Sequence, residues 1–285
     1  MEQINKKSKI CLMAAGITSR GIHREKNEDN YQLCSYYKAD SGTDYDSYVY
    51  ESRSGQRYQV FAIFDGMGGG KNGERASIYA AREMKNGYMM LELQSDISEE
   101  AASWVIKSFL QSANNRVVRT SEDTLGTTAV VGLFDTRENQ IKLFWSGDSR
   151  AYLYREKNVF QLTKDESVGE VRFENGDYGK DSFQYQKDRN KLIRYVGYDK
   201  SEYAFQPQES SWISIKEGDI FILVTDGVWE KLSGSQIRNI ICKAEENAVL
   251  SCEGLIKGAI QRCASDDMSA VVIKVCGNDF QKWRC

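Results

Sequence analysis

The stretch VFAIFDGMGGG, residues Val60–Gly70, changes character at its middle. Its first five residues are apolar, as in a buried strand, and the residues after them are Asp65 and a run of small residues rich in glycine. Glycine lets backbone groups approach a ligand closely because it has no side chain. The stretch therefore predicts a buried strand that carries a carboxylate to the edge of the core, although an ordinary Asp-Gly turn would explain the same residues.

The composition around this stretch indicates a globular protein with material for a real core. Of the 285 residues, 41% are hydrophobic, and the net charge of -3 provides no basic field for nucleic acid. No apolar run is long enough to span a membrane, and no signal-peptide core follows the polar segment 1–9. The seven cysteines include no CxxC pair, so reduced structural thiols are favoured over a zinc site. These features predict a cytoplasmic protein without membrane or nucleic-acid partners.

The periodicity of the chain predicts alternating groups of strands and helices. Strands are expected at 10–17, 30–37, 60–64, 127–134, 140–145, 150–154, 159–162, 219–225 and 268–275, and helices at 76–91, 98–117, 235–248 and 251–263. We expect a single domain over 10–276, with a polar segment 1–9 before it and a tail 277–285 after it.

Three connecting regions carry more specific predictions. Residues 38–59 are interpreted as a long surface hairpin that joins the second strand to the Val60 strand. Residues 127–162 are interpreted as an antiparallel meander. The polar segment 166–188 is expected to form an irregular flap.

Acidic residues recur where the buried strands end. Asp65, Asp148, Asp226 and Asp266 each lie at a junction with a buried β-run, and Asp29 stands just before a strand. Carboxylates crowded at one end of a core would repel one another, and a hard divalent cation such as Mg²⁺ or Mn²⁺ is the usual remedy. Two such ions can activate water and hold a phosphoryl group for in-line displacement.

A basic residue could complete such a site. Arg24 could supply a bidentate contact to phosphate oxygens. The spacing alone leaves open whether the acids converge, and the charged cluster 24–30 could equally be a solvated turn.

At this point the chain resembles the metal-dependent serine/threonine protein phosphatase family (PPM, type 2C), in its bacterial form. The resemblance is carried by an ordered series of blocks: R-x-x-N-E-D at 24–29, F-D-G-M-G-G at 64–69, L-G-T-T at 125–128, S-G-D-S-R at 146–150, L-T-x-D at 162–165, R-N-x-L-x-R-x-x-G at 189–197, L-V-T-D-G-V-W at 223–229 and D-D-M-S at 266–269. One block is weak evidence, but the ordered set is highly specific.

The resemblance implies an α+β fold of two stacked antiparallel β-sheets flanked by α-helices. This four-layer αββα sandwich would hold a dinuclear Mn²⁺ or Mg²⁺ centre at one end. The metal-site residues it implies are Asp65, the Gly66 carbonyl, Asp226 and Asp266, with Glu28 acting through water, Asp29 close behind, and Asp148 at a third, looser metal. The implied catalytic residues are Arg24, which binds substrate phosphate, and Asp65, Asp226 and Asp266.

The implied reaction is hydrolysis of phosphoserine and phosphothreonine in proteins by a metal-activated water that attacks phosphorus directly. Some departures from the family pattern bear on it. Met67 occupies the position of a histidine that some relatives carry, and His23, the single histidine, is expected to be an exposed neighbour of Arg24. Glu166 and Asp267 stand where histidine and asparagine are usual, and Asp267 adds a charge near the metals.

Two alternatives share the fold. A non-catalytic pseudophosphatase that binds phosphoproteins is supported only by the departures at Glu166 and Asp267. A regulator-type phosphatase ranks third because such proteins often lack residues like Arg24 and the acids at 28–29. The resemblance also implies phosphorylated protein substrates and a cognate serine/threonine kinase as partners, and we expect a monomer.

Overall fold

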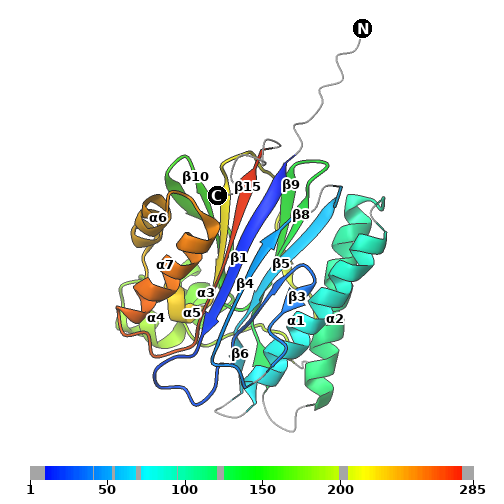
Figure 1. Ribbon diagram of the computed structural model, residues 1–285. Coiled ribbons are helices and arrows are strands. Elements are labelled where there is room, and N and C mark those ends of the chain that lie inside the picture. Colours follow the sequence, from blue (N-terminus) through cyan, green and yellow to red (C-terminus); the bar gives the residue numbers. More distant parts are fainter. Residues whose placement is uncertain are drawn as a thin grey trace.

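The computed structural model describes residues 10–40, 42–52, 55–68, 72–94, 96–120, 125–198 and 205–277. The predicted polar segment 1–9 and residues 278–285 of the predicted tail lie outside these ranges. Two antiparallel sheets stack face to face, with helices on the outer face of each (Figure 1).

The first sheet has six strands, in the spatial order β11-β10-β14-β15-β1-β4. These are β11 (Asn158–Gln161), β10 (Arg150–Arg155), β14 (Ile220–Val224), β15 (Met268–Cys276), β1 (Cys11–Ser19) and β4 (Tyr45–Glu51). Three helices lie at its outer face: α5 (Asp226–Trp229), α6 (Gly234–Lys243) and α7 (Ala248–Ile260).

The second sheet has seven strands, in the order β12-β9-β8-β5-β2-β3, with β13 also paired to β9. These are β12 (Gln208–Glu209), β9 (Gln140–Ser146), β8 (Ala129–Asp135), β5 (Tyr58–Phe64), β2 (Asn30–Leu33), β3 (Tyr36–Tyr37) and β13 (Ile213–Ser214). The helices α1 (Gly73–Leu93) and α2 (Glu99–Thr120) cover its outer face. The remaining elements are the small pair β6 (Gly66–Met67) and β7 (Gly126–Thr127), and the short helices α3 (Val168–Glu174) and α4 (Phe183–Asp188).

The apolar runs of the sequence are explained by strands that are buried on both faces. In β14, Phe221 and Leu223 point into the core between the two sheets, whereas Ile222 and Val224 point into the core under α5–α7. A strand covered on both faces needs apolar residues at every position and loses the usual alternation. The predicted α+β sandwich of two antiparallel sheets flanked by helices is therefore confirmed.

Two of the strand predictions were wrong in their details. The predicted strand 30–37 is a tight hairpin, because Cys34 takes a positive φ of 54° and the chain reverses between β2 and β3. The predicted surface hairpin 38–59 instead sends β4 to the other sheet, where it pairs with β1 as an edge strand. Strand alternation shows which residues face a core but does not show which sheet a strand joins.

The other two region predictions also need correction. The predicted meander 127–162 is divided between the sheets, since β8 and β9 pair in one sheet and β10 and β11 in the other. Gly147 makes this crossing possible with a φ of 100°. The predicted irregular flap contains helices α3 and α4, whose N-caps Ser167 and Ser182 each accept a backbone hydrogen bond.

Candidate metal and phosphate site

Five aspartates gather at one end of the two sheets, and we call them the acidic rim. They are Asp29, Asp65, Asp148, Asp226 and Asp266. Asp29 precedes β2 and Asp65 follows β5, and these antiparallel strands are in register at Asn30 and Phe64, so the two acids lie at the same sheet end. Asp148 lies in the turn between β9 and β10.

The first sheet brings Asp226 and Asp266 to the same end. Asp226 follows β14 and Asp266 precedes β15, and these strands pair antiparallel. The two connecting segments touch so closely that a Cβ on Gly227 would lie 2.0 Å from the Asp267 carbonyl oxygen. Only glycine allows this approach, so the glycine of the D-G sequence after β14 has a packing reason.

Two threonines tie the acids of the rim together. Thr225 Oγ1 donates to Asp29 Oδ2 at 2.8 Å and so links the two sheets. The Asp65 amide donates to Thr128 Oγ1 at 3.0 Å, and that hydroxyl lies 2.7 Å from Ser149 Oγ, next to Asp148. Sequence analysis assigned no role to these threonines, although Thr128 and Thr225 both stand in the blocks that carry the resemblance.

The electrostatics show that the rim acids face one another. Burial raises the pKa of Asp65, and the negative charges of Asp226, Asp29 and Asp148 raise it further. Burial and the charge of Asp226 likewise raise the pKa of Asp148. Burial, together with the charge of Asp266, raises the pKa of Asp226 to about 7. Such mutual effects require carboxylates at close range in a poorly solvated place.

The rim has the donor chemistry that a hard dication needs. Asp226 Oδ1 is buried without a hydrogen-bond partner. An unpartnered carboxylate oxygen among other acids would be stabilised by a bound Mg²⁺ or Mn²⁺. Within the described ranges no three ligand-type side chains already close around one point, so the acids form an open arrangement, not a finished cage. The residues fit the implied metals.

Arg24 and Glu28 lie beside the rim. Arg24 Nη2 contacts Asp266 Oδ2 at 2.5 Å, and its Nη1 lies 3.8 Å from Glu28 Oε2. The Arg24 side chain is 39% exposed, so its guanidinium can also meet a ligand from solvent. Glu28 Oε1 accepts from the Gly73 amide at 2.9 Å and so caps the start of α1. The water-mediated metal role of Glu28 stays a prediction.

The departures from the family pattern have distinct surroundings. His23 is exposed, as expected. Glu166 forms an ion pair with Arg194 at 2.6 Å and accepts from the Gly147 amide at 3.3 Å. Asp267 is buried, and its carboxylate oxygens accept the Gly21 and Glu28 amides. Burial raises the pKa of Asp267, and these amide hydrogen bonds oppose the shift.

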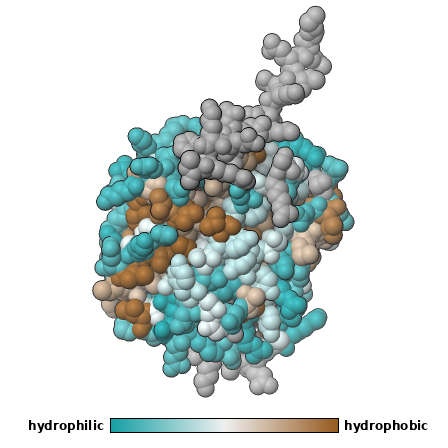
Figure 2. All heavy atoms as spheres, in the orientation of Figure 1, coloured by the Kyte–Doolittle hydropathy of each residue, from teal (hydrophilic) through white to brown (hydrophobic). Residues whose placement is uncertain are grey.

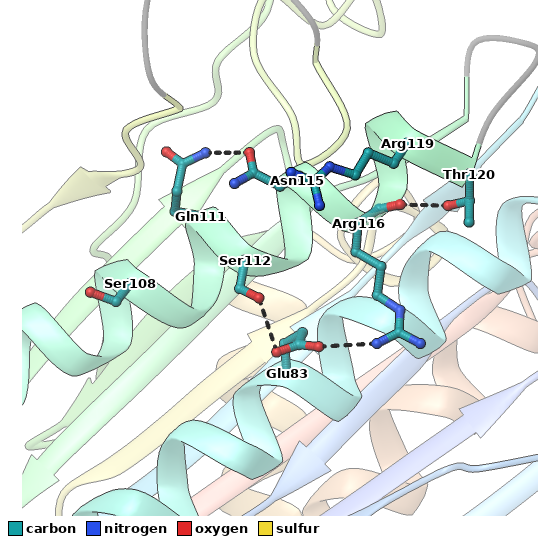
Figure 3. Close-up of a pocket in the computed structure, with 8 residues that line it drawn as sticks. All are labelled: Glu83, Ser108, Gln111, Ser112, Asn115, Arg116, Arg119 and Thr120. Carbon is teal, nitrogen blue, oxygen red and sulfur yellow. Dashed lines mark hydrogen bonds and ion pairs between the residues drawn. The ribbon is translucent and has the colours of Figure 1, made fainter.

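A groove between α1 and α2 lies outside this site (Figure 3). Glu83 and Arg116 face each other across it at 3.4 Å, and Ser112 donates to Glu83. Glu83 is ten residues beyond Gly73, about 15 Å along α1 at 1.5 Å per residue. None of the rim acids is among the residues that line this groove, so the groove has no part in the candidate site.

The fold and the acidic rim are those expected of a metal-dependent phosphatase. Comparisons with known proteins agree with this class. The Protein phosphatase 2C family model matches residues 33–172. Protein phosphatase PhpP of Streptococcus pneumoniae is 29% identical over 197 residues, covering 67% of this chain and 75% of that protein. Serine/threonine phosphatase stp of Listeria welshimeri is 24% identical, covering 94% of this chain and 96% of that protein.

A solved structure shows the same fold along nearly the whole chain. The catalytic domain of the serine/threonine protein phosphatase PstP, in complex with two manganese ions, aligns with a TM-score of 0.70 at 22% identity. The alignment covers 94% of this chain and 99% of that one. The match to the Protein phosphatase 2C family model over residues 33–172 and the similarity to bacterial serine/threonine phosphatases together support a bacterial phosphatase of this metal-dependent family. None of the helices in the described ranges has the length and apolarity to cross a bilayer.

Proposed function

We propose that the protein hydrolyses phosphoserine and phosphothreonine in protein substrates, with Mn²⁺ or Mg²⁺ held by the acidic rim. The observation that carries the proposal is the group of acids around Asp65, of which Asp29 and Asp148 are buried. In the described residues no ion pair to Asp65, Asp148 or Asp226 relieves their mutual repulsion. Similarity to bacterial phosphatases, and two manganese ions in the related PstP structure, support the choice of reaction and metal.

In this proposal Asp65, the Gly66 carbonyl, Asp226 and Asp266 hold the two ions. Glu28 would act through water, with Asp29 behind the pair and Asp148 at a third, looser ion. When bound, the ions supply positive charge that makes water a usable nucleophile for direct attack on phosphorus. The side chains of the protein would hold the substrate phosphate and keep the acids in place.

Arg24 is proposed to bind the substrate phosphate. Its planar guanidinium suits two phosphate oxygens at once, and its contact with Asp266 holds it directly beside the metal ligands. Thr128 and Thr225 would keep the acids at fixed positions through their hydroxyls. The helical segment 166–188 would form the flap beside the site, within a single phosphatase domain over 10–276.

The partners follow from the same proposal. Phosphorylated proteins would be the substrates, and a cognate serine/threonine kinase would produce them. A monomer in the cytoplasm is proposed from the sequence, and the cysteines of the described residues are free, in keeping with a reducing compartment.

The test is hydrolysis of a phosphothreonine peptide while Mn²⁺ is titrated, for the wild type and Asp226→Asn. The wild type should turn over only with the metal, and the variant should lose nearly all of this activity. Calorimetry of Mn²⁺ binding tests the pseudophosphatase alternative, because absence of divalent-ion binding together with absence of turnover would favour it. Wild-type turnover that Asp226→Asn leaves intact would contradict the proposed site.

A further inference from the structure

The segment that carries Arg24 has no regular structure of its own. Residues 20–29 form neither helix nor strand between β1 and β2. We call residues Gly21–Glu28 the Arg24 loop. A loop without a hydrogen-bonded ladder keeps one conformation only if other groups satisfy its backbone. Two buried charged side chains from elsewhere in the chain do this here, and the proposed function gives neither a role.

Asp267 binds both ends of the Arg24 loop. Its Oδ1 accepts the Gly21 amide at 2.8 Å and its Oδ2 accepts the Glu28 amide at 2.8 Å. The residue is 3% exposed, so water does not compete for these bonds. At Gly21 the fit is tight as well, because a Cβ there would lie 2.4 Å from the Asp266 carbonyl carbon.

The chemistry of these contacts requires a carboxylate. Both partners of Asp267 are N–H donors, and an ionised carboxylate offers an acceptor oxygen to each of them. An asparagine side chain has one acceptor oxygen and one NH₂ group, so one backbone N–H would face another donor. The aspartate at this position is therefore fitted to the loop.

Lys38 holds the same loop from the other side. Its ammonium donates to the Asn27 carbonyl oxygen at 3.2 Å, and the side chain is buried with the residue 2% exposed. The Lys38 carbonyl in turn accepts from Asn30 Nδ2 at 2.8 Å, which fixes the lysine to the start of β2. The loop is thus held by an anion at its amides and by a cation at a carbonyl.

We propose that Asp267 and Lys38 are positioning residues that preorganise the Arg24 loop, so that Arg24 meets substrate phosphate without a cost for ordering the loop. The identity of the ligand, a substrate phosphate, rests on the proposed function. The ordering of the loop by Asp267 and Lys38 does not depend on it. Neither residue touches the substrate in this proposal. Binding to a preordered site is tighter because no ordering entropy is lost at that moment.

The experiment compares Asp267→Asn with Asp135→Asn, a matched control. Asp135 is a buried acid that also accepts two backbone amides, those of Arg137 and Glu138, but it lies at the opposite end of the sheets. Amide hydrogen exchange is measured at Gly21 and Glu28 in the metal-free proteins. Inorganic phosphate is then measured as an inhibitor of peptide hydrolysis, and Mn²⁺ binding by calorimetry.

Asp267→Asn should speed exchange by about tenfold at whichever of the two amides loses its acceptor, the effect of losing one hydrogen bond to a charged group. The inhibition constant for phosphate and the KM should rise by about the same factor, with kcat changed less than about threefold. Asp135→Asn should leave the amide exchange at Gly21 and Glu28, the inhibition constant for phosphate and the KM unchanged. Lys38→Met removes the contact with the Asn27 carbonyl and also the positive charge near Asp29 and Asp267, and it should weaken phosphate binding in the same direction. It tests the inference if Asp267→Asn does not fold, and the calorimetry of Mn²⁺ binding shows whether the lost charge acts on the rim instead.

Unchanged exchange at Gly21 and Glu28 in Asp267→Asn would overturn the inference, as would a loss confined to Mn²⁺ affinity. Phosphate inhibition in Lys38→Met equal to that of the wild type would overturn it too. A wild type without phosphatase activity would refute the proposed function instead, and the exchange measurement would still decide whether the loop is held in this way.

Discussion

Buried aspartates stand at both ends of the sheets, in opposite electrical surroundings. At the end away from the rim, Asp135 closes β8 and meets the Arg57 guanidinium at 2.8 Å. Asp219, just before β14, meets Arg155 at 2.6 Å. At the rim, the carboxylates after β5 and β14 face other carboxylates instead, and the pKa of Asp226 rises to about 7.

The difference distinguishes charges that stabilise the fold, at the far end, from charges proposed to take part in the reaction, at the rim. At the far end an arginine pairs with Asp135 and another with Asp219, although these acids only stand at the ends of strands. The arginines near the rim are already engaged, since Arg150 holds Asp165 with two hydrogen bonds and Arg24 contacts Asp266. Among the described residues, Asp65, Asp148 and Asp226 form no ion pair with a basic side chain, which supports the proposed metals.

The largest expected effect is a difference in phosphatase activity between a variant at the rim and a variant at the far end of the sheets. Asp65→Asn removes a charge that would bind the ions, so kcat/KM for a phosphothreonine peptide should fall by about 10³-fold or more, ~4 kcal/mol of transition-state stabilisation. Asp135→Asn makes the same chemical change at the far end and should stay within about twofold per folded molecule. Steady-state kinetics with Mn²⁺ checks both, and an equal fall in the two variants would remove the distinction between the ends.

The next effect concerns the stability that the buried ion pair at the far end provides, compared with that of an exposed ion pair. Arg57→Met leaves Asp135 buried without its cation and should lower the free energy of unfolding by about 3 kcal/mol. Lys257→Met breaks only the exposed pair with Glu253 and should cost no more than about 0.5 kcal/mol. Urea unfolding at constant pH measures both values. A cost for Arg57→Met as small as that of Lys257→Met would show that the far-end pairing is not needed.

A smaller effect concerns pH in the metal-free protein. Because the pKa of Asp226 is raised in the folded state, its contribution to stability is fully present below the unfolded pKa near 4 and is lost as pH rises through about 7. For one such group, stability should fall by about 1.4 kcal/mol between pH 6 and pH 8. Thermal unfolding with a chelator measures the fall, and saturating Mn²⁺ should abolish it. Stability that rises over this range without metal would contradict the description of the rim.

The smallest effect is expected at the groove between α1 and α2. Arg116→Ala removes the contacts with Glu83 and with the Tyr79 ring, but the arginine side chain is 43% exposed and Ser112 still donates to Glu83. The loss of stability should be below about 1 kcal/mol, and kcat/KM should stay unchanged. A large loss of activity in this variant would mean that the groove contributes to the site after all.

The sandwich and most of its acids could be predicted from sequence, because apolar runs ending in Asp-Gly mark buried strands and their ends. The predicted positions of Asp65 and Asp226 after β5 and β14 are those that the structure describes. Sheet membership could not be predicted in the same way. Residues 38–59 and 127–162 alternate as strands should, but pairing across the two sheets depends on contacts far apart in the chain.

The polar side chains that hold the Arg24 loop could not be predicted from the sequence either. Lys38 appeared as one charge in a polar connection, and only the folded chain shows its buried ammonium at the Asn27 carbonyl. The departure at Asp267 was visible as an unusual residue, but its two amide partners lie about 240 positions earlier in the chain. No local pattern records a hydrogen bond of that separation.

The outer surface shows one more contrast. Hydrophobic side chains gather on the side where α7 lies (Figure 2). Leu250 and Ile260 of α7 are about half exposed, at 54% and 48%. Exposed apolar residues of this kind are common on folded proteins and here carry no assigned role.

The pairing of β1 with β15 has a consequence for synthesis on the ribosome. The first strand needs the last one beside it, with Cys11 opposite Cys276, and the segment before β15 supplies Asp266. Non-local pairings of this kind form late, since the intervening chain must first be closed into a loop. A nascent chain therefore gains the full set of carboxylates proposed to bind the metals only after β15 has been made, and products truncated before Asp266 would lack one of them.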